Sequence, residues 1–141
     1  MDIQVNLGPY KDAPRFLLEQ AARTTLLDDG RSGELSITLV GDHGIAELNT
    51  RYLGQDAPTD VLAFSIGTDQ LPLGDIYVCM DQAIRQASEN GVPLNEELVR
   101  LVIHGALHVL GHDHPKDSHR FTSPMFKLQE QLVDQVLNFL D

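Results

Sequence analysis

The sequence predicts an α+β fold, a single domain with a mixed sheet of about four strands and about five helices. Segments in which apolar and polar residues alternate, as in half-buried strands, are interleaved with segments of helical period. The strand-like runs 61–66 and 75–79 are separated by one short loop, which favours a hairpin and therefore a mixed sheet. The length of 141 residues and the hydrophobic content of 42% are sufficient for one domain with a buried core.

The N-terminal half begins with a strand and a helix and then repeats that order. Alternation predicts strands over 3–7 and 35–39, and the spacing of leucines and alanines predicts a helix over 14–27. Asp42 is expected to cap a short helix, because an aspartate side chain accepts hydrogen bonds from the first free N–H groups. The apolar face of that helix would consist of Ile45, Leu48 and Tyr52.

The C-terminal half is expected to complete the sheet and then to be helical. The run 61–66 is nearly continuous in apolar residues, which is typical of a central strand covered on both faces, and 75–79 would pair with it. Asp81 would cap a helix that ends at Asn90-Gly91. A further helix would cover 96–110, and Ser123-Pro124 would open the last one, with an apolar face of Leu128, Leu132, Val136 and Leu140.

Composition narrows the classes of function. The single cysteine, Cys79, excludes an internal disulfide and a cysteine-based zinc site. No stretch approaches the ~20 apolar residues of a membrane span, and no signal peptide is evident, so we expect a soluble cytoplasmic protein. The net charge of −11 repels polyanions at long range, and the ten lysines and arginines are scattered. Binding to nucleic acid would therefore require folding to gather cations into a local patch.

Two histidines lie on the helix predicted over 96–110. Apolar residues surround the axis of this helix, which predicts that it is buried. His104 and His108 are four residues apart, so their side chains lie on one face, about 6 Å apart along the axis. Both imidazoles can then reach a single zinc ion. Two buried histidines satisfied by hydrogen bonds alone are the alternative.

Gly111 is suited to a left-handed turn that ends the helix and brings the segment His112 to His114 back towards the same ion. One of these two histidines would complete a three-nitrogen site. The spacing matches the extended zinc motif of metzincin proteases. However, Gly105 stands where those proteases carry the glutamate that acts as general base, and this argues against a protease mechanism.

The segment from His104 to His114 resembles the signature of the YbeY family, bacterial zinc-dependent endoribonucleases linked to maturation of ribosomal RNA and to ribosome quality control. Further blocks resemble the family in the same order along the chain. They are Leu48-Asn49, Tyr52, Asp56, Pro58 to Leu62 with Phe64, Leu73 to Ile76, Met125-Phe126 and Gln129-Glu130.

The resemblance implies that His104, His108 and His114 hold one zinc ion, with a fourth position open to water or substrate. His112 is a rival third ligand, which would share the face of His104 and His108 if the helix continued, but Gly111 argues against continuation. The family usually carries an arginine, proposed to act on RNA, where this chain has Leu53. Arg51 lies two residues earlier, and on a helix it would point elsewhere.

The expected function is therefore that of one metal-dependent hydrolase domain over residues 1–141, an endoribonuclease acting on a ribosomal RNA precursor. The ribosome or its assembly factors are the expected protein partners. Two other functions fit the same residues: a zinc hydrolase of a small molecule or peptide, and a non-enzymatic ribosome-assembly module with a structural zinc. Asp60 is interpreted as a turn residue, and Asp113 either caps the turn or orients a ligand imidazole.

Overall fold

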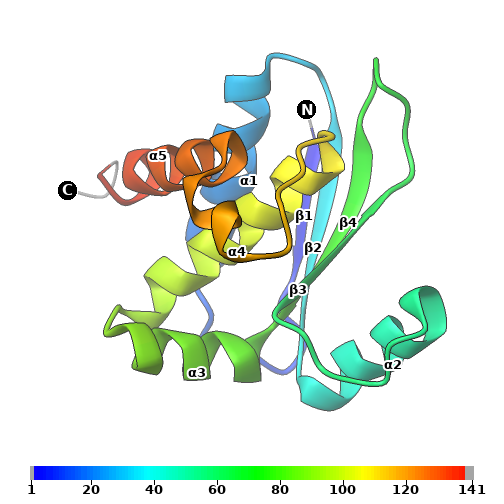
Figure 1. Cartoon of the computed structure of the whole chain (residues 1–141), viewed down its shortest axis with the longest axis vertical. Coiled ribbons are helices and arrows are strands. Elements are labelled where there is room, and N and C mark those ends of the chain that lie inside the picture. Colours follow the sequence, from blue (N-terminus) through cyan, green and yellow to red (C-terminus); the bar gives the residue numbers. More distant parts are fainter. Residues whose placement is uncertain (1, 139–141) are drawn as a thin grey trace.

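The sheet has four strands in the order β1-β2-β4-β3 and carries helices on both faces (Figure 1). The computed structural model describes residues 2–138. The strands are β1 (Asp2–Asn6), β2 (Glu34–Val40), β3 (Val61–Ser65) and β4 (Leu73–Cys79). The helices are α1 (Arg15–Asp29), α2 (Asp42–Leu53), α3 (Met80–Asn90), α4 (Leu94–Val109) and α5 (Pro124–Asn138), with a short 3-10 helix, η1 (Ser118–Thr122), before α5.

The predicted mixed sheet and hairpin are confirmed. β1 pairs with β2 and β2 pairs with β4 in parallel, whereas β3 pairs with β4 in antiparallel orientation across the hairpin loop. Figure 1 shows α1, α4 and α5 on one side of the sheet and α2 on the other. The single α+β domain therefore has its main core between the sheet and α1, α4 and α5.

The prediction that 61–66 forms a central strand is wrong, because β3 is the edge strand of the sheet. Its apolar run has a different cause. Val61 and Ala63 pack against the main core on one face, while Leu62 and Phe64 pack on the other face in a second cluster with Ile45 of α2. Both faces of an edge strand are thus covered, and its sequence resembles that of a central strand.

The predicted caps at Asp42 and Asp81 also differ from the structure. Gly41 and Cys79 are the N-cap residues of α2 and α3, and both aspartates lie in the first turn, where their charge still favours the positive end of the helix. Asp42 pairs with Arg85, at distances of 2.6 and 2.8 Å from its two carboxylate oxygens to Nη2.

Within residues 2–138, the remaining predictions for α2, α3 and α5 are confirmed except at Tyr52. The apolar face of α2 includes Ile45, but Tyr52 is 58% exposed and Asn49 is buried instead, with its side chain donating to the Ala57 carbonyl. Gly91 ends α3 in the left-handed conformation, as predicted. Ser123 caps α5 by accepting a hydrogen bond from the Phe126 amide. Leu132 and Val136 of α5 are buried, whereas Leu140 lies outside the described residues.

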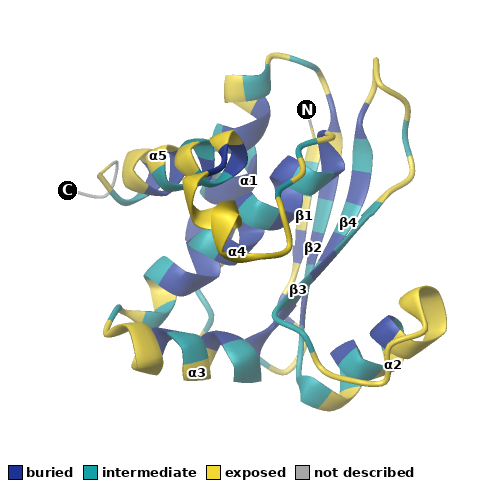
Figure 2. Cartoon of the chain, in the orientation of Figure 1, coloured by how far each residue is buried: buried dark blue, intermediate teal, exposed yellow. Residues whose placement is uncertain are grey.

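Helix α4 is the buried helix that its sequence predicts, as Figure 2 shows. Ten of its sixteen residues are buried. Two glycines permit its close approach to the sheet: a Cβ on Gly105 would lie 2.7 Å from Cγ2 of Ile76, and one on Gly74 of β4 would overlap Val109. Since α4 is fixed in this way, its histidine-bearing face opens beside β3.

None of the helices within residues 2–138 is long and apolar enough to cross a membrane.

Candidate metal centre

The end of α4 brings three histidines together. His104 and His108 lie one turn apart on α4, and Gly111, with φ of 99°, reverses the chain after the helix. This reversal returns His114 to the other two, so that the ring centroids of the three histidines are 4.6, 5.2 and 5.2 Å apart. One ring nitrogen from each histidine lies within 4.8 Å of the others, and all three residues are half-buried. These three side chains can hold a metal ion.

A hydrogen bond at Nδ1 orients each ring. Nδ1 of His104 lies 2.7 Å from the side-chain oxygen of Gln129, Nδ1 of His108 lies 3.1 Å from the His112 carbonyl, and Nδ1 of His114 lies 2.8 Å from the Pro115 carbonyl. A carbonyl oxygen accepts, so Nδ1 must carry the proton and Nε2 must be the bare nitrogen. The Nε2 atoms of His104 and His108 face each other at 3.1 Å. Two lone pairs at this distance favour a cation between them.

Burial keeps the two helical histidines neutral. It lowers the pKa of both His104 and His108 below the ordinary value of 6.5, and the neighbouring histidines add to the effect. The carboxylate of Asp60 partly opposes the lowering at His104. Neutral imidazoles are the form that binds metal ions, so this shift favours metal binding at neutral pH.

The rival ligand His112 lies outside the cluster. It contributes its backbone carbonyl to His108, whereas its side chain acts weakly on Asp29, whose pKa is lowered mainly by a hydrogen bond from Arg31. The carboxylate of Asp113 accepts a hydrogen bond from the backbone amide of His114, as a turn-capping residue does. Of the histidines around Gly111, the structure therefore places His114, not His112, with His104 and His108.

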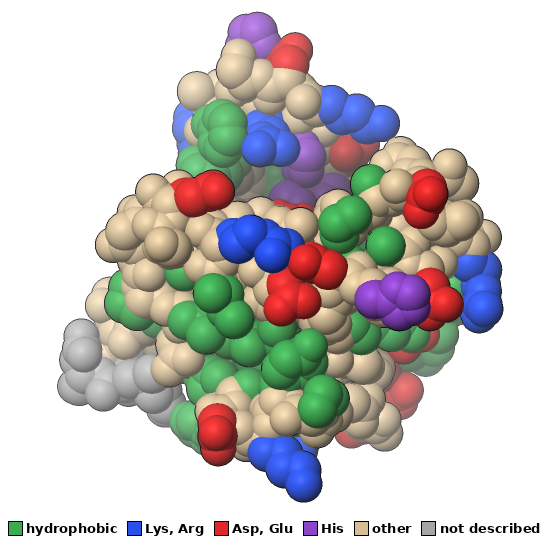
Figure 3. All heavy atoms as spheres, turned by 90° about the horizontal axis from the view of Figure 1, so that it is seen from below, with side chains coloured by type: hydrophobic (Ala, Val, Ile, Leu, Met, Phe, Trp, Pro, Cys, Tyr) green, Lys and Arg blue, Asp and Glu red, His purple; other side chains and the backbone are tan. Residues whose placement is uncertain are grey.

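The three histidines line a cleft of about 550 Å³. Seen from below, histidine side chains lie in a hollow under a lobe that bears basic and hydrophobic groups (Figure 3). Charged and aromatic residues contribute to the lining, namely Asp60, Glu97, Arg100, Arg120, Phe121 and Phe126. The lining does not include Leu53, and Arg51 lines a separate depression around α2. Arg51 therefore does not replace the family arginine in this cleft.

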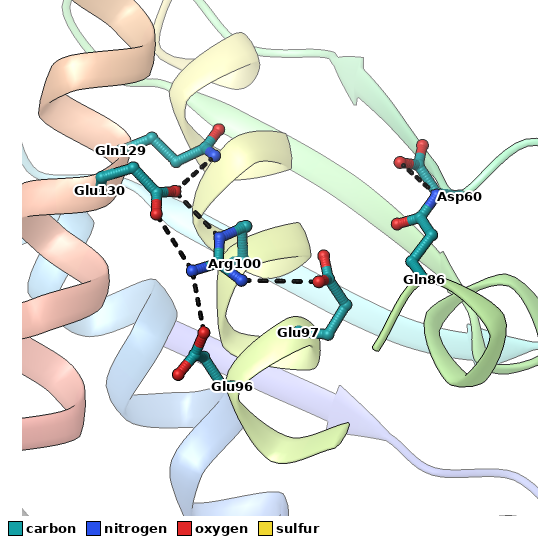
Figure 4. A network of polar contacts seen from close by, with 7 residues as sticks. All are labelled: Asp60, Gln86, Glu96, Glu97, Arg100, Gln129 and Glu130. Atoms are coloured by element: carbon teal, nitrogen blue, oxygen red, sulfur yellow. Dashed lines mark hydrogen bonds and ion pairs between the residues drawn. The ribbon is translucent and has the colours of Figure 1, made fainter. Parts of the chain in front are cut away.

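A polar network joins α4 to α5 beside the cleft, and Figure 4 shows its residues, of which Glu97, Arg100 and Gln129 line the cleft. Gln129 accepts from His104 and donates to Glu130, at 3.0 Å, and Glu130 makes a two-pronged contact with Arg100, at 2.9 and 3.0 Å. Arg100 also contacts Glu96, at 3.1 Å, and the buried Glu97, at 3.5 Å. Burial raises the pKa of Glu97, although Arg100 opposes this shift. The network fixes the Gln129 amide, and through it the ring of His104.

Sequence reasoning noted Gln129-Glu130 only as a family block and gave Arg100 no role. The spacing of Glu96, Glu97 and Arg100 on one helix was the available signal, since residues three and four apart are neighbours. The contact from α4 to α5 has no such local signal.

A second group could hold a metal by distance alone. Asp42, Cys79 and Asp81 bring their ligand atoms within 4.8 Å of one another. However, Arg85 engages both carboxylate oxygens of Asp42, and burial raises the pKa of the Cys79 thiol to about 11. A protonated thiol is a poor metal ligand. The histidine cluster is the better candidate.

The chain matches known proteins over nearly its whole length. The family model described as Endoribonuclease YbeY matches residues 2–137. A Persephonella marina protein named Endoribonuclease YbeY is 42% identical, covering 97% of this chain and 92% of that protein. A Myxococcus xanthus protein of the same name is also 42% identical, covering 94% of this chain but 47% of its own length, so the chain spans about half of that relative. The solution structure of a Thermotoga maritima protein matches with a TM-score of 0.70 and 31% identity, covering 99% of this chain and 91% of the other. The chain belongs to the Endoribonuclease YbeY family.

Proposed function

We propose that residues 1–141 form one metal-dependent hydrolase domain, a cytoplasmic endoribonuclease that cleaves phosphodiester bonds in a ribosomal RNA precursor. The observation that carries this proposal is the cluster of His104, His108 and His114, whose oriented rings face an open cleft. Relatives of the chain are named for endoribonuclease activity. We further propose that the ribosome or its assembly factors present the RNA, because an acidic chain with a net charge of −11 attracts free RNA poorly.

The donor set fits one zinc ion. Three neutral imidazole nitrogens beside an open cleft are typical of catalytic zinc sites, which keep a position free for water or substrate. When bound, zinc would act as a Lewis acid on the phosphate and lower the pKa of water to about 7. His104, His108 and His114 would hold the ion, and Gln129 would keep His104 in the required tautomer through its hydrogen bond to Nδ1.

Asp60 is our candidate for the group that accepts a proton from the nucleophile, which is either water or the RNA 2′-hydroxyl. Gly105 has no side chain for this task, and of the described residues that line the cleft only Asp60 and Glu97 are carboxylates. Glu97 is engaged with Arg100. Asp60 is held by the Val61 amide at 2.8 Å and by Gln86 at 3.2 Å, which fixes its carboxylate at the wall of the cleft. We therefore propose a role in proton transfer for Asp60 in addition to its predicted place in the turn before β3.

Two alternatives fit the geometry less well. A structural zinc site is closed by four protein ligands. Here the cluster consists of three histidines among the described residues, and the neighbouring Asp113 is turned to the backbone of His114. A hydrolase of small or peptide substrates would be favoured by an acidic cleft. The described lining instead contains two arginines, Arg100 and Arg120, beside its two carboxylates.

The test is cleavage of a labelled single-stranded ribosomal RNA fragment by the wild-type chain and by His108→Ala, with folding of the variant checked by circular dichroism. We expect cleavage by the wild type and loss of cleavage by a folded variant. Equal cleavage by both proteins would refute a role for the cluster. Mass spectrometry of the cut ends then identifies the nucleophile, because attack by the RNA 2′-hydroxyl leaves a cyclic phosphate and attack by water does not.

A further inference from the structure

The 3-10 helix η1 places a cation and an aromatic ring at the cleft. Arg120 and Phe121 line the cleft together with the three histidines. The guanidinium carbon of Arg120 lies 4.7 Å from the centroid of the Phe121 ring. Phe121 is 53% exposed, and its ring meets Phe126 edge to face, with centroids 5.5 Å apart and planes at 87°. Arg120 and Phe126 therefore both contact the Phe121 ring, and about half of the Phe121 side chain remains exposed.

The two arginines of the cleft differ in their partners. Arg100 is engaged by three carboxylates, those of Glu96, Glu97 and Glu130, and so has no free charge to offer a ligand. Arg120 forms no ion pair with any residue in the span 2–138, for which contacts are described. In a chain with a net charge of −11, an unpaired guanidinium beside the histidines is a local site for an anion.

The position of Phe121 distinguishes it from other exposed rings of the chain. Single exposed hydrophobic residues are ordinary on protein surfaces. Phe16 on α1, for example, is 56% exposed and does not line the cleft. Phe121 combines exposure with an adjacent cation, a supporting ring and a place in the wall of the histidine cleft. Single-stranded nucleic acid is bound by this combination, in which bases stack on aromatic side chains and cations contact the phosphates.

We propose that Arg120 and Phe121 form a subsite for single-stranded RNA, in which Phe121 stacks on an unpaired base and Arg120 binds an adjacent phosphate. This inference rests on the proposed function and names two residues of η1 that bind the RNA at the cleft. A paired base is unavailable for stacking, so the subsite selects unpaired RNA over duplex. It also supplies the cleft with a cation on η1, whereas Leu53 ends α2.

Tryptophan fluorescence tests the stacking directly, because the chain contains no tryptophan. Phe121→Trp introduces one fluorophore at the subsite, and Phe16→Trp introduces a matched one on α1. Each full-length variant is titrated with a short single-stranded oligoadenylate, with a chelator present so that the RNA stays intact. We expect quenching at position 121 and none at position 16, and no quenching at either position by a duplex of the same length. No change at position 121, or equal changes at both positions, would overturn the proposal.

Affinity measurements test the same two residues separately. Phe121→Ala is expected to weaken binding of fluorescently labelled oligoadenylate by about fivefold or more, from the usual contribution of one stacked base. Arg120→Gln is expected to reduce the slope of log affinity against log salt by about 0.7, the value for one phosphate contact with a single strand. Lys127→Gln on α5 removes the same charge from an exposed position outside the cleft lining and should leave the slope unchanged. An unaltered slope for Arg120→Gln, or no RNA binding by the wild type, would refute the subsite.

The proposed function and the subsite can fail independently. Cleavage that requires His108, together with wild-type RNA affinity in both subsite variants, would retain the endoribonuclease and reject the subsite. Quenching at position 121 in a chain that cleaves no RNA would retain the subsite and reject the endoribonuclease.

Discussion

At the scale of single residues, the orientation of each imidazole is what suits the cluster to hold a metal ion. The three Nδ1 atoms face carbonyl oxygens of Gln129, His112 and Pro115, which leaves Nε2 of each ring without a proton. Two of these acceptors are backbone groups of the segment that follows Gly111. The reversal of the chain therefore supplies a third histidine and also orients His108.

The two histidines that flank Asp113 are predicted to differ in metal affinity. His114→Ala should weaken zinc binding by more than the ~10–100-fold that is typical for loss of a group supporting a ligand. His112→Ala should leave the affinity at the wild-type value, because only the backbone of His112 contacts the cluster. Competition with a fluorescent zinc chelator measures both constants. Greater loss in His112→Ala than in His114→Ala would show that the ligand assignment is wrong.

Gln129 is predicted to act on the metal through His104. Gln129→Leu removes the acceptor from Nδ1 and should weaken zinc binding by about 10–100-fold. Gln131→Leu makes the same change at an exposed position on α5 and should have no effect. The same chelator competition compares the two variants, and equal zinc affinities would show that Gln129 does not support the ligand His104.

At the scale of elements, α4 lies close to the sheet because glycine occupies the contact position on each side. Gly105 brings the helix against Ile76, and Gly74 leaves room for Val109. A glutamate at position 105, as metzincin proteases have, would not fit this contact. The absence of a general base from α4 thus follows from packing, and the carboxylates of the cleft come from the segment before β3 and from the first turn of α4.

Gly105→Ala is predicted to destabilise the protein. The added Cβ would meet Cγ2 of the fully buried Ile76 at 2.7 Å, and overpacking of this kind costs about 1–3 kcal/mol. The higher helix propensity of alanine offsets about 1 kcal/mol. Gly44→Ala on α2 is the control, because its nearest contact would be an ordinary 3.4 Å to Val40, and we expect it to be neutral or stabilising. Urea unfolding measures both, and a more stable Gly105→Ala would contradict the packing argument.

The elements also show where sequence reasoning succeeds. Alternation, apolar runs, helical spacing and capping residues identified the strands and α-helices, and the i, i+4 spacing placed His104 and His108 together, because these patterns are local. The edge position of β3 was missed because both of its faces are covered, so its sequence is as apolar as that of a central strand. Its place at the edge depends on the strand order, which the local sequence does not contain. The Gln129 contact was missed because it depends on how α5 docks against α4, which no short sequence pattern encodes. η1 was missed although Asp117 caps it locally by accepting a hydrogen bond from the His119 amide.

At the scale of the whole molecule, charge and burial determine how the protein responds to solution conditions. The net charge of −11 opposes the approach of RNA, while the cleft contains Arg120, whose guanidinium has no ion-pair partner among residues 2–138. The net charge therefore repels RNA at long range, whereas the Arg120 guanidinium attracts a phosphate close to the cleft. RNA binding is therefore expected to depend on contacts made at the cleft and not on long-range attraction.

Stability of the metal-free protein is predicted to fall as the pH drops below about 6.5. Burial lowers the pKa of His104 and His108 in the folded state below this ordinary value, so the unfolded chain binds more protons in this range. The free energy of unfolding therefore decreases as the pH falls through 6.5 towards the folded-state values. His108→Gln should show a weaker dependence than the wild type, because one of the two histidines with a lowered pKa is then absent. Urea unfolding at a series of pH values checks this, and stability that rises as the pH falls through 6.5 would contradict it.

The role of the histidine cluster is tested by the rate of RNA cleavage while zinc is titrated into the metal-free protein. If His104, His108 and His114 hold one catalytic ion, the rate should rise in proportion to added zinc and level off at one equivalent per chain. His108→Ala should stay inactive throughout the titration. A rate that does not depend on zinc, or cleavage by His108→Ala equal to that of the wild type, would show that the histidine cluster is not the catalytic centre.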